Sequence, residues 1–293
     1  MRLTNKLGLP EAIFEAVKAD PYTRGGAEIS VTQLIKPPRM VALEREHKDE
    51  ITEDCADRIW SLLGQAIHTI LERAALTAIA ERRLFIEVEG WTVSGGMDLY
   101  DHAGVLTDYK VTSVYAVKDG LKDEWVHQLN CYAEILRKHG HLVSGLNVIC
   151  ILRDWSKMEA GRDPYYPQAQ VIRMEVPLWS SDDAYQYLRE RVILHQQARV
   201  KLPECSPEDR WARPDVWAVM KVGRKTAVRL YSNEDEARAH VGFDKDLSVV
   251  HRPGVSVRCT SYCSVSKFCS QNQALSARPT EDAGDEKTVA KEG

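Results

Sequence analysis

The sequence predicts an α/β fold with a mixed central sheet flanked by helices. Helical periodicity and strand-like alternation follow one another along the chain in the order helix, three strands, helix, two strands, helix. With 293 residues, the chain is long enough for one large domain or two modest ones. A hydrophobic content of 44% and a charged content of 28% are ordinary for a globular protein with a sizeable core.

Helices are indicated by apolar residues on one helical face, and strands by alternation or short apolar runs. The predicted helices begin near residue 10 and cover 53–83, 123–138, 182–200 and 234–241. The predicted strands cover 84–91, 93–100, 105–111, 146–152 and 170–176, followed by a hairpin of 217–221 and 226–231. In the N-terminal segment, Pro37 and Pro38 are expected to end any regular element.

These elements divide the chain into four predicted regions. Residues 1–48 hold a helix and a basic connector, 49–200 the α/β core, 201–275 the hairpin and a cysteine-rich segment, and 276–293 a polar tail. The tail has no apolar period and is expected to be disordered. No apolar run approaches the ~20 residues needed to cross a membrane, and the first residues lack the apolar core of a signal peptide. We therefore expect a cytoplasmic protein whose thiols remain reduced.

Residues 95–110 carry the most informative chemistry. Asp98 lies near the end of one predicted strand, and the next strand supplies Asp108 and Lys110. Because these two residues are two apart on a strand, their side chains point to the same face. Carboxylates hold hard divalent cations through oxygen, and an ammonium can orient or activate water or neutralise a phosphate. The set suits metal-dependent phosphodiester hydrolysis, although a polar hairpin with a surface salt bridge has the same pattern.

Three further side chains complete an ordered set. His68 lies on the helix before these strands, while Gln128 and Tyr132 are four apart and share a face of the helix after them. Taken singly, each is typical of an ordinary helix, and Tyr132 suits a core position equally well. In this order and on these element types, the set resembles the PD-(D/E)XK nuclease superfamily, and within it the RecB-like branch, over residues 50–180.

The resemblance implies a restriction-endonuclease-like core with one or two bound Mg²⁺ or Mn²⁺ ions, which oxygen ligands favour. The implied metal ligands are His68, Asp98, Asp108 and the main-chain carbonyl of Tyr109. The remaining implied catalytic residues, a lysine and a pair that holds DNA and active site together, are Lys110, Gln128 and Tyr132. Such ions stabilise transition-state charge and lower the pKa of the attacking water.

A second constellation consists of Cys259, Cys263 and Cys269, spaced C-x₃-C-x₅-C. Three thiolates this close in sequence can converge on one metal centre, but they need a fourth ligand for tetrahedral zinc or an iron–sulfur cluster. The alternative is a set of ordinary buried and exposed thiols. Cys131 and Cys150 fall within apolar patterns and are predicted to be buried thiols.

Several RecB-like nucleases, among them AddB-type helicase–nuclease subunits and CRISPR-associated adaptation nucleases, carry a 4Fe–4S cluster. They use one cysteine before the nuclease core and three after it, and the three C-terminal cysteines here resemble that pattern with a wider first gap. For the fourth ligand we favour Cys205, in a loop-like Leu-Pro-Glu-Cys-Ser-Pro setting, over Cys55, on or beside the first core helix. The implied cluster is structural and holds the C-terminal segment against the nuclease core, and a zinc ion would serve the same purpose.

The expected function is that of a Mg²⁺- or Mn²⁺-dependent DNA exonuclease acting on ends or single strands. No G-x-x-x-x-G-K-[ST] loop is present, so a motor would be a separate protein. The expected partner is DNA, with further copies of the chain, a recombinase or a helicase as additional candidates, and no membrane. The layout resembles nucleases of bacteriophages or recombination operons, which implies the cytoplasm of a bacterium or of a phage-infected host.

Two alternatives remain at this point. One is a restriction or junction-resolving endonuclease with the same core, and the other is a catalytically silent DNA-binding repair protein with a zinc staple. In each of these interpretations, candidate phosphate contacts are Lys36, Arg39, Arg224 and Lys225, although ordinary solvated charge explains these residues equally well. Candidate aromatic residues for base stacking, which suit core packing as well, are Trp211, Trp217 and Tyr231.

Overall fold

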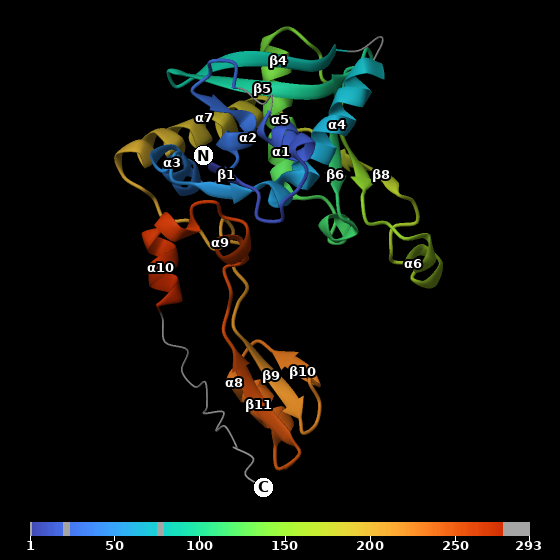
Figure 1. Cartoon of the computed structure of the whole chain (residues 1–293), viewed down its shortest axis with the longest axis vertical. Helices are drawn as coiled ribbons and strands as arrows, with labels where there is room; N and C mark the ends of the chain where they lie inside the picture. The colour runs from blue at the N-terminus through green and yellow to red at the C-terminus, as the bar shows by residue number, and fades with distance from the viewer. Residues whose placement is uncertain (1, 20–23, 75–78, 278–293) are drawn as a thin grey trace. The chain divides into compact units, whose positions relative to one another are not determined.

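A six-stranded mixed sheet organises the first of two units, Met1–Pro203 and Glu204–Gly293 (Figure 1). The computed structural model describes residues 2–19, 24–74 and 79–277. The strand order is β2-β5-β6-β7-β8, with β4 paired to β5. The strands are β2 (Ile29–Ser30), β4 (Ile79–Val88), β5 (Trp91–Tyr100), β6 (Val105–Thr112), β7 (Gly145–Leu152) and β8 (Val171–Val176). The predicted mixed α/β architecture is confirmed.

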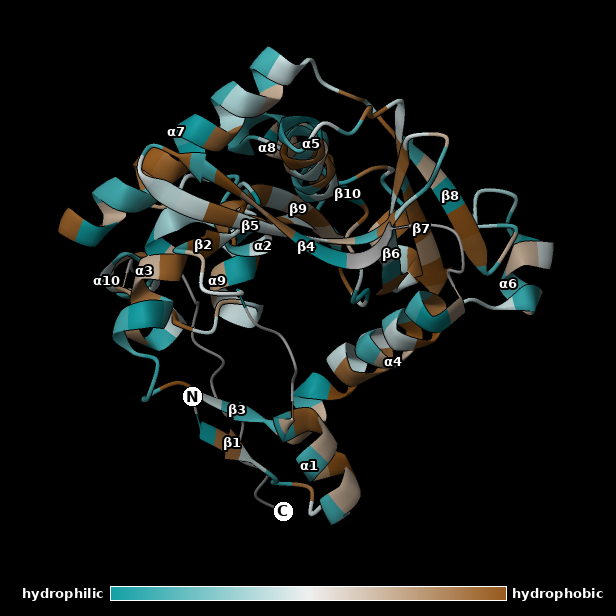
Figure 2. Cartoon of the chain, turned by 90° about the horizontal axis from the view of Figure 1, so that it is seen from above, coloured by the Kyte–Doolittle hydropathy of each residue, from teal (hydrophilic) through white to brown (hydrophobic). Residues whose placement is uncertain are grey.

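Helices cover this sheet and supply its core. They are α1 (Glu11–Lys18), α2 (Val31–Leu34), α3 (Pro38–Glu46), α4 (Ile59–Ala74), α5 (Asp123–Lys138), α6 (Lys157–Arg162) and α7 (Ser181–Val200). A short parallel pair, β1 (Arg2–Thr4) and β3 (Thr52–Asp54), lies outside the main sheet. α5 packs on β4 to β8 and on α7, and α4 packs on β5 and β6. Strand β7 is mostly apolar, as its brown colour shows (Figure 2), which fits a strand buried inside the sheet.

The sheet opens between β5 and β6. Along one edge, β5 pairs with β4 over its whole length. Along its other edge, β5 pairs with β2 at Val93–Ser94 and with β6 at Leu99–Tyr100. Between those two pairings, the stretch from Gly95 to Asp98 borders a gap, because β6 turns away to pair with β7 along eight residues. The N-terminal segment thus contributes a strand, β2, to one side of this opening.

The predicted helix over 53–83 is wrong at both ends, because β3 and a 3-10 helix at Cys55–Arg58 precede α4 and β4 begins at Ile79. α4 ends at Ala74, and β4 runs antiparallel to β5 across a two-residue turn at Glu89 and Gly90. Both turn residues have positive φ, as a type I′ hairpin requires. The Ala-, Glu- and Arg-rich composition before Leu84 favours a helix locally, but pairing with β5 overrides that preference.

The double proline separates two helices. α2 ends at Leu34, before the prolines, as expected. Pro38, however, occupies the first turn of α3 instead of closing the segment. A proline fits there because its missing N–H would have no intrahelical acceptor. The other predicted helices of this unit, α1, α5 and α7, are confirmed within two residues of their predicted starts, as are β6, β7 and β8.

The second unit contains a three-stranded antiparallel sheet in the order β10-β9-β11. Its elements are β9 (Val216–Lys221), β10 (Arg229–Tyr231), α8 (Glu234–Val241), β11 (Leu247–Arg252), α9 (Val257–Ser261) and α10 (Ser270–Ser276). The predicted hairpin and α8 are confirmed, while β11, which is largely exposed, was missed. Residues 278–293, most of the tail predicted to be disordered, lie outside the described residues. In the described part of the chain, no helix has the length and apolar character of a membrane span.

A buried histidine joins α7 to α2. His195 is 3% exposed, and its Nε2 donates to the Leu34 carbonyl over 2.9 Å. Arg191, one turn earlier on α7, donates to the same carbonyl over 3.0 Å. Burial lowers the pKa of His195 to about 4, and the nearby charges of Arg191 and Arg45 act in the same direction, against the Leu34 hydrogen bond. The imidazole is therefore neutral in the folded protein near neutral pH.

This histidine should make the fold sensitive to acid. An unfolded histidine titrates near pH ~6.5, so between there and pH ~4 the unfolded chain binds the extra proton and stability falls as pH decreases. The full effect is on the order of 3 kcal/mol. In urea titrations at about pH 7.5 and about pH 5, wild type should lose roughly 2 kcal/mol more unfolding free energy than His195→Gln, which cannot titrate. An equal loss in both proteins would contradict this assignment.

Candidate active site

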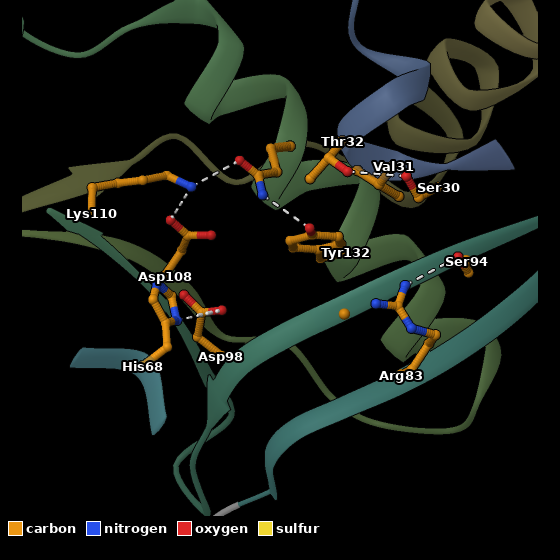
Figure 3. Close-up of a pocket in the computed structure, with 12 residues that line it drawn as sticks. Ser30, Val31, Thr32, His68, Arg83, Ser94, Asp98, Asp108, Lys110 and Tyr132 are labelled. Carbon is orange, nitrogen blue, oxygen red and sulfur yellow. Dashed lines mark hydrogen bonds and ion pairs between the residues drawn. The ribbon is translucent and has the colours of Figure 1, made fainter. Parts of the chain in front are cut away.

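A cavity of about 230 Å³ lies where β5 and β6 separate. That volume is much larger than the space one water needs. Six of its lining side chains are the ones singled out from the sequence (Figure 3): His68, Asp98, Asp108, Lys110, Gln128 and Tyr132. They come from α4, β5, β6 and α5, so four separate elements bring them together. Tyr109, predicted as a ligand through its carbonyl, is outside the cavity lining that the described residues form.

Asp98 is held by both of its carboxylate oxygens. The backbone N–H of Tyr109 donates to Oδ2 over 2.8 Å, which ties β5 to β6. Oδ1 lies 3.4 Å from Nδ1 of His68, which reaches in from α4. The His68 ring also meets the Tyr109 ring edge-on, with centroids 6.3 Å apart. These contacts place an imidazole and a carboxylate side by side at one end of the cavity.

Asp108 is the most strongly perturbed carboxyl of the site. Its side chain is 5% exposed, and its Oδ2 lies 2.7 Å from Nζ of Lys110. Burial raises the pKa of Asp108 to about 6; Lys110 opposes this effect and Asp98 adds to it. Apart from this ion pair with Lys110, the buried Oδ2 has no hydrogen-bond partner among the described residues. Asp98 and Asp108 repel one another, and the Lys110 ammonium is the cation that lies beside Asp108.

Lys110 remains a cation in this arrangement. Burial alone would lower the pKa of Lys110, but attraction to Asp108 and Asp98 outweighs it, so the pKa lies above its ordinary value. Nζ also donates to Oε1 of Gln128 over 3.1 Å, and Nε2 of Gln128 donates to the Tyr132 hydroxyl over 2.9 Å. The chain of bonds fixes the Gln128 amide in one orientation. It links the ammonium on β6 to the phenol on α5.

The backbone of β5 leaves room for Tyr132. A Cβ at Gly95 would come within 2.9 Å of the Tyr132 ring, so glycine is needed for the ring to lie against the strand. Gln128 and Tyr132 are 7% and 3% exposed, which places both inside the fold and not on a helix surface. Glu72, one turn after His68, is exposed and does not line the cavity.

The side chains of His68, Asp98 and Asp108 are of the kinds that bind a divalent cation. Two carboxylates and an imidazole are adjacent, and the buried Oδ2 of Asp108, which is ion-paired with Lys110, is an oxygen of the kind that hard cations prefer. Among the described residues, no group of three or more His, Cys, Asp or Glu side chains lies in metal-holding geometry. In the structure, Lys110 and the Tyr109 N–H take the places beside the carboxylates.

Other residues of this cavity were not anticipated from the sequence. They are Ser30, Val31, Thr32, Arg83, Ser94 and Gly96. Arg83 was hidden because it was assigned to the end of a helix, whereas it lies on β4 opposite Gly96. The pair Gly95-Gly96 is the sequence signal that could have indicated a close approach of other residues to the backbone of this strand. The serines carry no motif.

In the second unit, two structural links bring three predicted cluster cysteines into one region. The side chain of Gln271 accepts from the N–H of Cys205 over 2.9 Å and donates to its carbonyl over 3.0 Å. Gln271 lies on α10, whose N-cap is Cys269, so Cys205 is drawn toward Cys269. On α9, burial and the neighbouring Cys269 raise the pKa of the Cys259 thiol. Cys263 lies two residues after the end of α9 and is half-buried.

The remaining cysteines are buried in the first unit. Cys55, Cys131 and Cys150 are each 0% exposed, which confirms the burial predicted for the last two. Burial raises the pKa of the Cys131 thiol, and raises that of Cys150 to about 11. Cys55 donates through Sγ to Oδ1 of Asn5 over 3.4 Å. Cys55 belongs to the first unit, whereas Cys205, Cys259, Cys263 and Cys269 belong to the second.

The predicted phosphate contacts differ in accessibility. Arg39 is 6% exposed and donates to the Pro203 carbonyl over 3.0 Å, so it stabilises the first unit instead of facing solvent. Lys36 lies 3.7 Å from Glu44. Arg224 and Lys225 are exposed on the turn after β9.

The predicted stacking residues are engaged within the second unit. Trp211 lies edge-on to Tyr262 and beneath Arg258, and Trp217 lies 5.0 Å from the His251 ring. The Tyr231 hydroxyl lies 2.6 Å from Nδ1 of His240.

The chain has a distant likeness to a solved structure. No family model and no curated protein matches it. A structure described as "Crystal structure of SSO0001" is similar over 63% of this chain and 84% of that chain, with a TM-score of 0.45 and 16% identity. A likeness this low carries no argument about function, which therefore depends on the geometry of the site.

Proposed function

We propose that the first unit is a metal-dependent deoxyribonuclease of the PD-(D/E)XK superfamily, RecB-like branch, which hydrolyses phosphodiester bonds at DNA ends or in single strands. One observation carries the proposal: six side chains chosen by their order in the sequence line a single cavity, although they come from four elements. A polar hairpin with a surface salt bridge would not bury Asp108, Gln128 and Tyr132 together.

The cationic and the anionic residues of the cavity would have different roles in the reaction. The Lys110 ammonium, held by Gln128, would neutralise charge on the reacting phosphoryl group and orient the attacking water. Tyr132 would contact DNA beside it. Mg²⁺ or Mn²⁺, held by Asp98, Asp108 and His68 with the Tyr109 carbonyl as a further oxygen, would lower the pKa of that water and stabilise transition-state charge.

The proposal is tested with purified full-length protein and three labelled DNAs: a single strand, a linear duplex and a covalently closed circle. Each is incubated with Mg²⁺, with Mn²⁺ or with chelator. We expect metal-dependent shortening of the linear substrates from their ends and no change in the circle. Nicking of the circle would instead identify an endonuclease, and binding without cleavage a silent DNA-binding protein. Any unwinding of duplex DNA would depend on a separate helicase or recombinase partner.

We also propose that Cys205, Cys259, Cys263 and Cys269 hold a structural 4Fe–4S cluster, with zinc as the alternative. The contacts of Gln271 with Cys205 and the proximity of Cys259 to Cys269 support a common centre. The three-stranded sheet of the second unit lies between Cys205 and Cys259 in sequence, so a bound centre would hold the two ends of that segment together. Metal binding of this kind contributes directly to folding.

Replacing Cys259 with serine should therefore release the metal and loosen the second unit. Anaerobically purified wild type should be coloured and contain iron, and Cys259→Ser should lose both the visible absorbance and the iron. Cys131→Ala, which removes a buried thiol of the first unit, is the control and should keep them. Elemental analysis and limited proteolysis check the result. Equal metal content in all three proteins would contradict the cluster. A colourless wild-type protein with stoichiometric zinc would show that the bound metal is zinc and not iron.

A further inference from the structure

The cavity has a second polar end, distinct from the carboxylates. Figure 3 shows Arg83 and Ser94 at this end, Ser30 and Thr32 beside them, and Tyr132 between them and the acidic side chains. Nη1 of Arg83 donates to Oγ of Ser94 over 3.2 Å. The Ser94 side chain is 0% exposed, so the guanidinium is held by a hydroxyl that is itself fixed inside the sheet. This end of the cavity carries a positive charge and hydroxyl groups.

The hydroxyls of β2 and α2 face the same space. Oγ of Ser30 lies 3.0 Å from Oγ1 of Thr32 and accepts from the backbone N–H of Gln33 over 3.4 Å. Ser30 is 2% exposed and sits next to Ser94 in the pairing of β2 with β5. Hydroxyls can donate to an anion, and an arginine fork matches the oxygens of a phosphate. The group of Arg83, Ser94, Ser30 and Thr32 thus has the chemistry of a phosphate-binding subsite.

Strand geometry sets the spacing between the two ends. Ser94, Gly96 and Asp98 alternate along β5 and face the same side. Four residues of strand separate Ser94 from Asp98, or ~13 Å. A single phosphate group cannot span that distance, so a group at Arg83 and a group at the carboxylates would be two different phosphates of one chain.

Gly96 keeps the path between the two ends open. A Cβ at this position would come within 3.2 Å of Nη2 of Arg83 and would stand in the cavity. The edge of β5 from Gly95 to Asp98 borders the gap between β2 and β6, and Gly96 lines the cavity there without a side chain. A nucleic-acid strand can therefore lie across this stretch while contacting both ends.

We propose that Arg83, Ser94, Ser30 and Thr32 bind a second phosphate of the nucleic-acid substrate and thereby set how the strand is placed over the reacting bond. This inference rests on the proposed nuclease function. The bound phosphate is either a terminal monoester at a DNA end or an internal diester, and both present the same oxygens to the subsite.

The test measures binding separately from cleavage. Fluorescence anisotropy with Ca²⁺ in place of Mg²⁺ compares wild type, Arg83→Gln and Arg82→Gln for a labelled single strand. Arg82 is the matched control: it precedes Arg83 on β4, is exposed, and points to the opposite face by strand alternation. Arg83→Gln should weaken binding by about tenfold or more, since a hydrogen-bonded charge is lost. The slope of log affinity against log salt should fall by ~0.7 for one single-strand phosphate contact.

A second variant guards against a simple folding defect. Gly96→Ala keeps every charge and adds one methyl group against the flexible end of Arg83, so the fold should persist, as a melting curve would show. It should weaken binding without changing the salt slope, because no charge is removed. Probes with a 5′-phosphate, a 5′-hydroxyl, a 3′-phosphate or a closed circular strand identify the source. Preference for one phosphorylated end assigns a terminal phosphate, and equal effects on all probes assign an internal one.

The outcomes separate this subsite from the nuclease proposal. If wild type cleaves DNA and Arg83→Gln binds as Arg82→Gln does, the subsite is overturned and the nuclease stands. If wild type binds in an Arg83-dependent way but cleaves none of the substrates, the nuclease is overturned and the subsite stands. If wild type neither binds nor cleaves DNA, both are overturned.

Discussion

Lys110→Met is expected to lower metal-dependent DNA cleavage by roughly 10²–10³-fold, the effect of removing one preorganised electrostatic group from an active site. Methionine keeps much of the side-chain volume but removes the ammonium that lies 2.7 Å from Asp108. DNA binding should change far less, because the other cavity residues remain. Initial rates of end-labelled substrate digestion measure the loss.

A matched control for this variant is Lys118→Met, which removes an exposed lysine of the same unit. It should retain wild-type rates. The Lys110→Met protein should also be less stable, because the carboxylate of Asp108 stays buried without its cation. A cooperative melting curve would verify that the Lys110→Met protein is folded. If that folded variant cleaved DNA at the wild-type rate, Lys110 would not be a catalytic residue.

Asp108→Asn is expected to abolish the stabilisation that Mn²⁺ gives to the wild-type protein. A ligand at a hundred times its dissociation constant stabilises a fold by about 2.7 kcal/mol, which for a unit of this size raises the melting temperature by roughly 5–10 °C. The buried Oδ2 of Asp108, which is ion-paired with Lys110 and has no hydrogen bond among the described residues, is the oxygen best placed to supply that binding energy. An uncharged amide of similar shape would not replace it.

The exposed Asp119 offers a control of identical chemistry, since Asp119→Asn removes one carboxylate away from the cavity lining. It should keep the full Mn²⁺-dependent shift. Differential scanning fluorimetry with and without Mn²⁺ compares the three proteins. A shift of equal size in Asp108→Asn would place the cation elsewhere in the molecule.

The parts of the fold that the sequence predicted well are those whose local pattern agrees with their surroundings. α5 has the predicted bounds, Asp123–Lys138, because acidic residues lie in its first turn, basic residues lie in its last turn, and Gly140, just after the helix, has positive φ. β4 was missed at its start because its composition favours a helix while its partner, β5, decides its state. Pairing between distant segments is not visible in local periodicity.

The candidate site follows the same division. The acidic residues, the lysine and the Gln-x-x-x-Tyr pair are spaced regularly enough to be found in one sequence, and the cavity collects them. Arg83 and Ser94 have no such spacing, since their meeting depends on the register of two strands. The Tyr109 carbonyl as a metal ligand and the cysteine centre stay predictions. Among the described residues, no three His, Cys, Asp or Glu side chains lie in metal-holding geometry.

The hairpin turn at Glu89 and Gly90 has a consequence for how substrate choice can change over time. It begins six residues from Arg83, ~20 Å along the strand, yet it fixes which residue of β4 faces Gly96. One residue inserted there would slide the ladder by a step and turn the guanidinium to the other side of the sheet. An insertion at this remote surface turn can thus change which side chains line the cavity while the six cavity residues predicted from the sequence stay in place.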